Sequence, residues 1–283
     1  MYTTLSNGIK IFYREAGSKD GPVILLLHGF PTSSFQYRNL MSALSPKYHV
    51  LAPDLPGFGF TEVPSSVKFE YTFANIATTV ASFLDAHRID KFAVYVFDYG
   101  APTGFRIALE RPSSITAIIT QNGNAYEDGL GDFWAPLKSL WADDNKDIRE
   151  AIRSAALSFE GIRDQYVRGE PDPDAIDPAT YHLDAALVDR PGNKDIQLDL
   201  LKDYETNVAL YPRFHEYFRR SQVPLLAAWG RNDIIFIPPG AEAFKRDLPN
   251  AEIRWVDGGH FALEAHVDEI AGLVLEFLDK NGI

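Results

Sequence analysis

The sequence predicts an α/β protein with a mostly parallel central sheet, flanking helices and an inserted helical cap. Three observations predict this fold class. Short, continuous apolar runs alternate with segments of helical spacing up to residue 121. The alternation stops near residue 125 and resumes after residue 220. Polar side chains follow the ends of several apolar runs, as expected at the carboxyl edge of a parallel sheet.

The first half of the chain supplies most of the predicted sheet. The dipeptide Asn7-Gly8 is a hairpin-turn signal and precedes a predicted strand at 9–15. Unbroken apolar runs are typical of strands buried on both faces, whereas apolar residues spaced three or four apart indicate helices. We therefore predict further strands at 22–29, 48–54, 91–97 and 115–121, and helices at 73–87 and 100–110.

The second half begins with the segment that breaks this alternation. Residues 125–220 are rich in aromatic and acidic residues and are predicted to form helices and loops. Strands are predicted again at 224–230 and 251–257, followed by a final helix near 262–280. We expect one core built from residues 1–124 and 221–283, with 125–220 inserted as the helical cap.

Composition and charge exclude several classes of protein. The 283 residues carry a formal net charge of −12, with no basic face predicted, which argues against a nucleic-acid partner. The chain has no cysteine, which rules out disulfides and thiolate catalysis. The first residues lack a basic start and an apolar run, and no stretch is long enough to cross a bilayer. The expectation is a cytoplasmic protein without a membrane partner.

Three polar side chains follow ends of predicted strands. Asp98 follows the strand 91–97, Asp233 follows 224–230, and His260 follows 251–257. Carboxyl ends of parallel strands gather at one edge, so these side chains are expected to meet there. Their order, nucleophile then acid then histidine, is the α/β-hydrolase order with aspartate in place of serine. The alternative is that Asp98 merely caps the following helix.

Five motifs carry a resemblance to a known family. They are HGFP (28–31), DLPGFG (54–59), VFDYG (96–100), WGRND (229–233) and GGHFALE (258–264). Together they resemble the α/β-hydrolase superfamily along nearly the whole chain, and within it the branch of epoxide hydrolases and haloalkane dehalogenases. The turn departs from the usual pattern because Val96 occupies the place of a common glycine.

The resemblance implies a covalent mechanism. The carboxylate of Asp98 would attack an sp3 carbon and form an ester, which a water activated by His260 then hydrolyses. Asp233 would orient the imidazole and stabilise its protonated form. By resemblance, the backbone N–H groups of Phe30 and Tyr99 would form the oxyanion hole. A serine nucleophile would form a stable ether with such a substrate, whereas the aspartyl ester can be hydrolysed. An ordinary ester hydrolase is disfavoured because serine is missing from the nucleophile position.

An epoxide leaves an alkoxide that needs a proton, and tyrosine suits that task. Epoxide hydrolases place two tyrosines in the cap. The segment 200–212 resembles one of their segments and matches at Tyr204, while 161–171 resembles the other in an uncertain register, with Tyr166 as candidate. Tyr126 is a further candidate. Each of these tyrosines has the alternative of simple packing with a solvated hydroxyl.

Two other functions remain open at this point. Haloalkane dehalogenases hold halide with Trp and Asn where this chain has Tyr99 and Phe30, although Trp134 or Trp141 of the cap could substitute. A catalytically silent binding protein on the same fold is the other alternative, which retention of Asp98, Asp233 and His260 disfavours.

The remaining predictions concern the ligands. Trp134, Trp141 and Tyr126 are expected to belong to the cap core or to the wall of an apolar pocket. The expected substrate is a small, largely apolar organic molecule, with water as co-substrate. No metal is implied, because the histidines lack ligand-like spacing, and no cofactor is expected, because no dinucleotide or phosphate-loop motif is present. The oligomeric state stays open, a homodimer included.

Overall fold

The computed structural model describes residues 2–283, and its centre is one eight-stranded sheet. The strands lie in the order β1-β2-β4-β3-β5-β6-β7-β8. The first two neighbouring pairs in this order are antiparallel and the others are parallel. The bounds are β1 Tyr2–Ser6, β2 Ile9–Ala16, β3 Val23–Leu27, β4 His49–Pro53, β5 Phe92–Phe97, β6 Ile115–Gln121, β7 Leu225–Gly230 and β8 Glu252–Val256.

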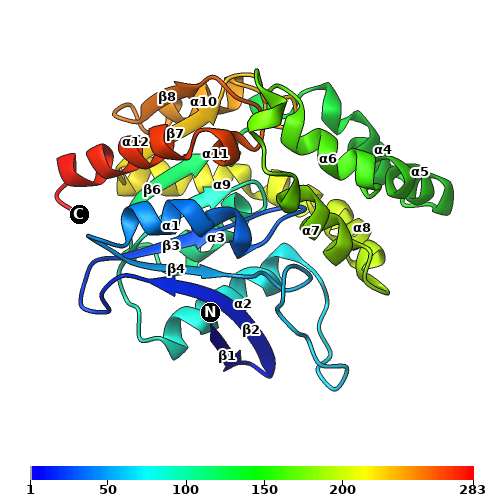
Figure 1. The fold of residues 1–283 in the computed structure, drawn as a ribbon, viewed down its shortest axis with the longest axis horizontal. Helices are drawn as coiled ribbons and strands as arrows, with labels where there is room; N and C mark the ends of the chain where they lie inside the picture. Colours follow the sequence, from blue (N-terminus) through cyan, green and yellow to red (C-terminus); the bar gives the residue numbers. More distant parts are fainter. Residues whose placement is uncertain (1) are drawn as a thin grey trace.

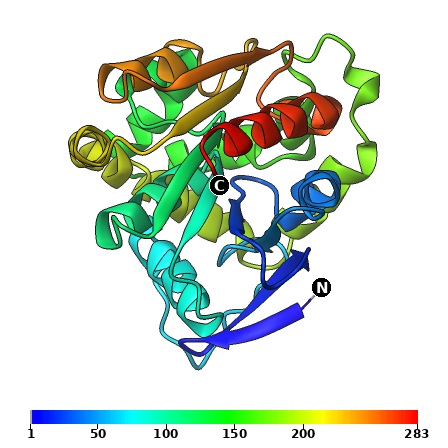
Figure 2. The same cartoon turned by 90° about the vertical axis from the view of Figure 1, so that its left-hand side faces the viewer.

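Helices cover both faces of this sheet, as Figure 2 shows. One face is covered by α1 (Arg38–Leu44) and α12 (Val267–Lys280), which contact each other. The other is covered by α2 (Phe73–Ala86), α3 (Gly100–Glu110) and α9 (Glu205–Ser221), with α3 touching both neighbours. Alternate residues of β3 and β5 point into two separate apolar clusters, one on each face. This explains why the central strands appear in the sequence as unbroken apolar runs.

The segment between β6 and β7 is helical. Its helices α4 to α8 lie together at one end of the sheet (Figure 1). Their bounds are α4 Ala135–Ala142, α5 Lys146–Ala156, α6 Phe159–Val167, α7 Pro178–Val188 and α8 Asn193–Asp203. Consecutive cap helices contact one another, and α8 also contacts α4 and α5. The helix α9 then runs back along α3 towards β7.

The predicted fold class is confirmed, with three differences in detail. The hairpin signal at Asn7-Gly8 joins β2 to an additional edge strand, β1, and both turn residues have positive φ. The final predicted helix is divided at His266 into α11 (Ala262–Ala265) and α12. The short helix α10 (Pro239–Ala243) lies between β7 and β8. None of the helices within residues 2–283 has the length and apolar character needed to span a bilayer.

Candidate active site

Asp98 occupies a sharp turn between β5 and α3. Its φ of 48° lies in the left-handed region, which a non-glycine residue adopts at a cost in energy. The residue is 5% exposed. The backbone N–H of Phe30 donates to its Oδ1 at 2.6 Å. The turn therefore holds a buried carboxylate in one orientation, with one oxygen anchored and Oδ2 facing the histidine.

Glycines make room for this turn. A Cβ on Gly29 would lie 2.2 Å from Oδ1 of Asp98, and one on Gly100 would lie 2.0 Å from the Leu27 carbonyl oxygen. The unusual Val96 is accommodated by Gly104 of α3, where a Cβ would lie 2.8 Å from the valine side chain. The missing glycine at position 96 is thus matched by a glycine one turn into the helix.

His260 connects the other two predicted residues. Its Nδ1 lies 2.8 Å from Oδ2 of Asp233, and its Nε2 lies 3.8 Å from Oδ2 of Asp98. Both Asp233 and His260 are buried, and Nε2 has no hydrogen-bond partner within residues 2–283. With the proton on Nδ1 held by Asp233, Nε2 presents a lone pair towards Asp98 and can act as a base.

Asp233 is held in place by Asn122, whose role the sequence did not reveal. The Asn122 amide donates to Oδ2 of Asp233 at 2.7 Å, and its oxygen accepts from the N–H of Gly230 at 2.9 Å. Asn122 directly follows β6 and also has a positive φ, of 50°. The neighbouring Gln121 donates to the His260 carbonyl oxygen at 2.9 Å. The end of β6 therefore fixes both the acid and the histidine loop.

The charges of these groups depend on each other. Burial raises the pKa of Asp98 to about 6, against the opposing effects of His260 and of the backbone N–H groups of Phe30 and Tyr99. Burial alone would lower the pKa of His260, but its contact with Asp233 and the proximity of Asp98 raise it overall. Both N–H groups predicted for the oxyanion hole therefore act on the carboxylate.

A cavity of about 680 Å³ opens onto Asp98. Phe30, Asp98 and Tyr99 form its base, and the cap helices α4, α5 and α6 supply most of its walls. Most of its lining side chains are apolar, and Gln165 is a buried polar residue among them. Within the described part of the chain, no lysine or arginine lines it.

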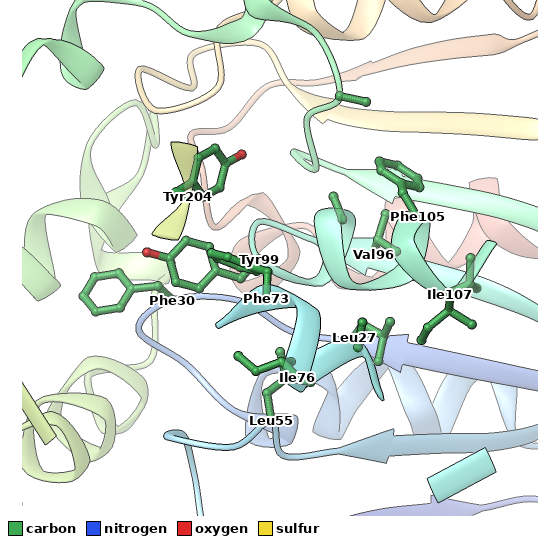
Figure 3. Packing of buried hydrophobic residues seen from close by; sticks show 14 of the residues in the cluster. Leu27, Phe30, Leu55, Phe73, Ile76, Val96, Tyr99, Phe105, Ile107 and Tyr204 are labelled. Carbon is green, nitrogen blue, oxygen red and sulfur yellow. The ribbon is translucent and has the colours of Figure 1, made fainter. Parts of the chain in front are cut away.

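Tyr99 and Tyr204 lie close together, as Figure 3 shows. Their ring centroids are 5.8 Å apart. Tyr99 lines the cavity, and its hydroxyl is buried without a hydrogen-bond partner in residues 2–283. The Tyr204 hydroxyl lies 3.3 Å from that of Tyr211, and the Tyr204 ring packs on Trp134. Burial raises the pKa of both phenols well above 10, so both remain protonated.

The structure does not bring Tyr166 or Tyr126 to the cavity. The Tyr166 hydroxyl donates to the buried Asp184, and its ring stacks on Phe261. The Tyr126 hydroxyl donates to Asp247 at 2.8 Å. Neither tyrosine lines the cavity, and Tyr204 is not among its lining residues either. In the segment that suggested Tyr166, the residues that line the cavity are Gly161, Asp164 and Gln165.

The two cap tryptophans differ in position but share one property. Trp134 lines the cavity, whereas Trp141 does not. The Trp134 indole N–H donates to the Ile235 carbonyl oxygen at 2.7 Å. The Trp141 indole N–H donates to the Leu201 carbonyl oxygen at 2.9 Å. Both indole donors are therefore already used within the protein.

Comparisons with known proteins agree with the fold. A family model described as alpha/beta hydrolase fold matches residues 22–267. An uncharacterised hydrolase of Saccharomyces cerevisiae is 48% identical over 98% of this chain and 96% of its own length. Haloalkane dehalogenase 2 of Mycobacterium bovis is 35% identical over 94% of this chain and 91% of its own. Among solved structures, the epoxide hydrolase CorEH is similar with a TM-score of 0.77 at 22% identity, covering 99% of this chain and 98% of that one.

Proposed function

Because this chain belongs to the α/β-hydrolase fold family, in the branch of haloalkane dehalogenases and epoxide hydrolases, we propose that it is a hydrolase with Asp98 as nucleophile. The observation that carries the proposal is the geometry around that carboxylate. It is buried in a strained turn, anchored by the Phe30 N–H at 2.6 Å, and 3.8 Å from Nε2 of His260. A helix cap would need neither the histidine nor the anchoring N–H.

The preferred reaction is the opening of an epoxide to a vicinal diol. Oδ2 of Asp98 attacks a ring carbon, the carbon–oxygen bond breaks, and the alkoxide takes a proton from a phenol. Water then attacks the ester carbonyl while Nε2 of His260 accepts its proton. The N–H groups of Phe30 and Tyr99 stabilise the oxyanion. Collapse expels the alkoxide, which takes the proton of the new Asp98 carboxyl group to give the diol, and the proton on His260 returns to the phenolate.

The phenol is expected to be Tyr99 or Tyr204. Tyr99 lines the cavity, and its buried hydroxyl has no hydrogen-bond partner within residues 2–283, which favours Tyr99 as the donor. Tyr204 does not line the cavity and its hydroxyl lies 3.3 Å from that of Tyr211, so its support as the second phenol is limited to its ring contact with Tyr99. Tyr166 is disfavoured as a donor, because its hydroxyl is engaged by Asp184.

The surroundings of the leaving group favour an epoxide over a halide. A departing halide needs N–H donors at the cavity, and the indole N–H groups of Trp134 and Trp141 are both bonded to backbone carbonyls. A substrate carboxylate would lack a cationic partner, since the described cavity lining contains no arginine or lysine. These observations also disfavour a halogenated acid. Dehalogenation of a neutral alkyl halide by the same ester mechanism is the second candidate.

The test measures diol formation from a panel of terminal and disubstituted epoxides, with Asp98→Asn as the blank. We expect turnover that disappears in this variant. Tyr99→Phe and Tyr204→Phe should each slow ring opening, and the larger loss identifies the main donor. Absence of turnover on every epoxide would contradict the proposal. Halide release from alkyl halides by the same sample would then favour the dehalogenase, and its absence a silent binding protein.

A further inference from the structure

The cavity has an extension that the proposed chemistry does not use. Beyond Asp98 it continues between α4, α5 and α6. One face of α5 lines it, with Ile148, Ala151, Ile152 and Ala155 at helical spacing, followed by Ala156. From Ile148 to Ala156 the helix rises about 12 Å. We call this part of the cavity the α5 groove.

The α5 groove is lined mainly by apolar residues. Its wall on α5 is built from alanine and isoleucine, and Leu137 of α4 and Gly161 of α6 face the same space. Ala151 and Ala155 are exposed, so apolar surface here is open rather than packed against the protein. Exposed apolar surface that continues from a nucleophile is a usual feature of a substrate subsite.

The charged residues of the cavity disfavour a substrate that carries a second negative charge. Besides Asp98, the charged side chains that line it are Asp132 and Asp164. Asp132 is exposed, while Asp164 is paired with the exposed Arg168 at 2.8 Å. The net charge of −12 also repels an anionic substrate.

Resting on the proposed function, we propose that the substrate is an epoxide at the end of a linear, uncharged alkyl chain, and that this chain lies in the α5 groove. The epoxide carbons reach Asp98, the chain runs along α5, and a carboxylate at its far end is rejected by the acidic residues. The groove thus selects for chain length and against charge.

The first experiment uses terminal epoxides of butane, hexane, octane and decane. We expect kcat/KM to rise by up to about fourfold per methylene group buried in the groove. Ala155→Phe fills the groove and should lower kcat/KM for the decane epoxide about tenfold more than for the butane epoxide. Ala186→Phe is the matched control, because Ala186 is exposed on α7 and does not line the cavity.

Two decane epoxides with a hydroxyl or a carboxylate at the far end of the chain have similar shapes but different charges, so comparing them isolates the effect of charge. The carboxylate should be used on the order of tenfold less well than the hydroxyl, and Asp132→Asn should narrow this difference. Three results would overturn the proposal: no gain with chain length, an equal effect of Ala155→Phe on short and long epoxides, or equal use of both end groups.

A binding measurement keeps this inference separate from the chemistry. Trp134 lines the cavity, so its fluorescence should respond to decanol. Suppose that no epoxide is turned over, but decanol binds, its binding is weakened by Ala155→Phe, and decanoate binds less tightly than decanol. The proposed reaction is then wrong, and the proposed role of the groove is supported. If epoxides are turned over but decanol binds equally to wild type and Ala155→Phe, the proposed reaction is supported and the proposed role of the groove in binding the alkyl chain is wrong.

Discussion

Asp98→Asn should abolish turnover and yet make the protein more stable at neutral and alkaline pH. Burial raises the pKa of Asp98 from 3.8 to about 6, so the folded state holds this proton more tightly than the unfolded state. Below pH 3.8 the carboxyl is neutral in both states and costs nothing. As pH rises through 3.8 to 6 the unfolded chain releases the proton first, and wild-type stability falls.

The size of the effect follows from the shift in pKa. At about 1.36 kcal/mol per pKa unit, ionised Asp98 costs roughly 3 kcal/mol at pH 8 and about half of that at pH 5. Asparagine removes this cost and keeps an oxygen that accepts the Phe30 N–H. Urea unfolding of both proteins from pH 5 to 8 measures the difference. A variant that is less stable than wild type, or a difference that does not grow with pH, would refute the reasoning.

The other predictions concern the nucleophile and its support. The kcat/KM for an epoxide should fall about tenfold per unit below pH 6 as Asp98 takes up a proton, and a pH–rate profile measures this loss. Gly29→Ala places a Cβ 2.2 Å from Oδ1 of Asp98 and should cost on the order of a hundredfold in kcat, whereas Gly272→Ala in α12, which meets nothing within 4 Å, should leave kcat unchanged. Asn122→Ala removes a hydrogen bond to the Asp233 carboxylate and should lower kcat about tenfold to a hundredfold, with KM nearly constant; an unchanged kcat would deny Asn122 a positioning role.

The positions of the central strands and the meeting of Asp98, Asp233 and His260 at one edge of the sheet could be predicted, because each strand and the residue after it are marked by local sequence. Continuous apolar runs mark strands buried on both faces, and the residues after them share one edge of the sheet. The glycine that accommodates Val96 was harder to identify, because Gly104 belongs to the next helix and meets the valine only after both elements form. The role of Asn122 was hidden for a similar reason, since its partner Asp233 is 111 residues away.

The cap shows where sequence reasoning reaches its limit. Successive residues of a helix point about 100° apart, so an error of one residue exchanges the cavity face for a packed face. Such a shift of one residue distinguishes Gln165, which lines the cavity, from Tyr166, whose hydroxyl donates a hydrogen bond to Asp184. The tryptophans pose a different difficulty. Whether an indole N–H is free depends on a backbone carbonyl distant in sequence, as with Trp134 and Ile235.

The measurement that tests the central claim most directly is covalent trapping. His260→Gln removes the base for ester hydrolysis and leaves Asp98 in place, so an epoxide should remain attached to the enzyme. Intact-mass analysis should show one added substrate mass, and peptide mapping should locate it on Asp98. The same reaction with Asp98→Asn should add nothing. An adduct on another residue, or turnover by His260→Gln without any Asp98 adduct, would contradict the carboxylate mechanism.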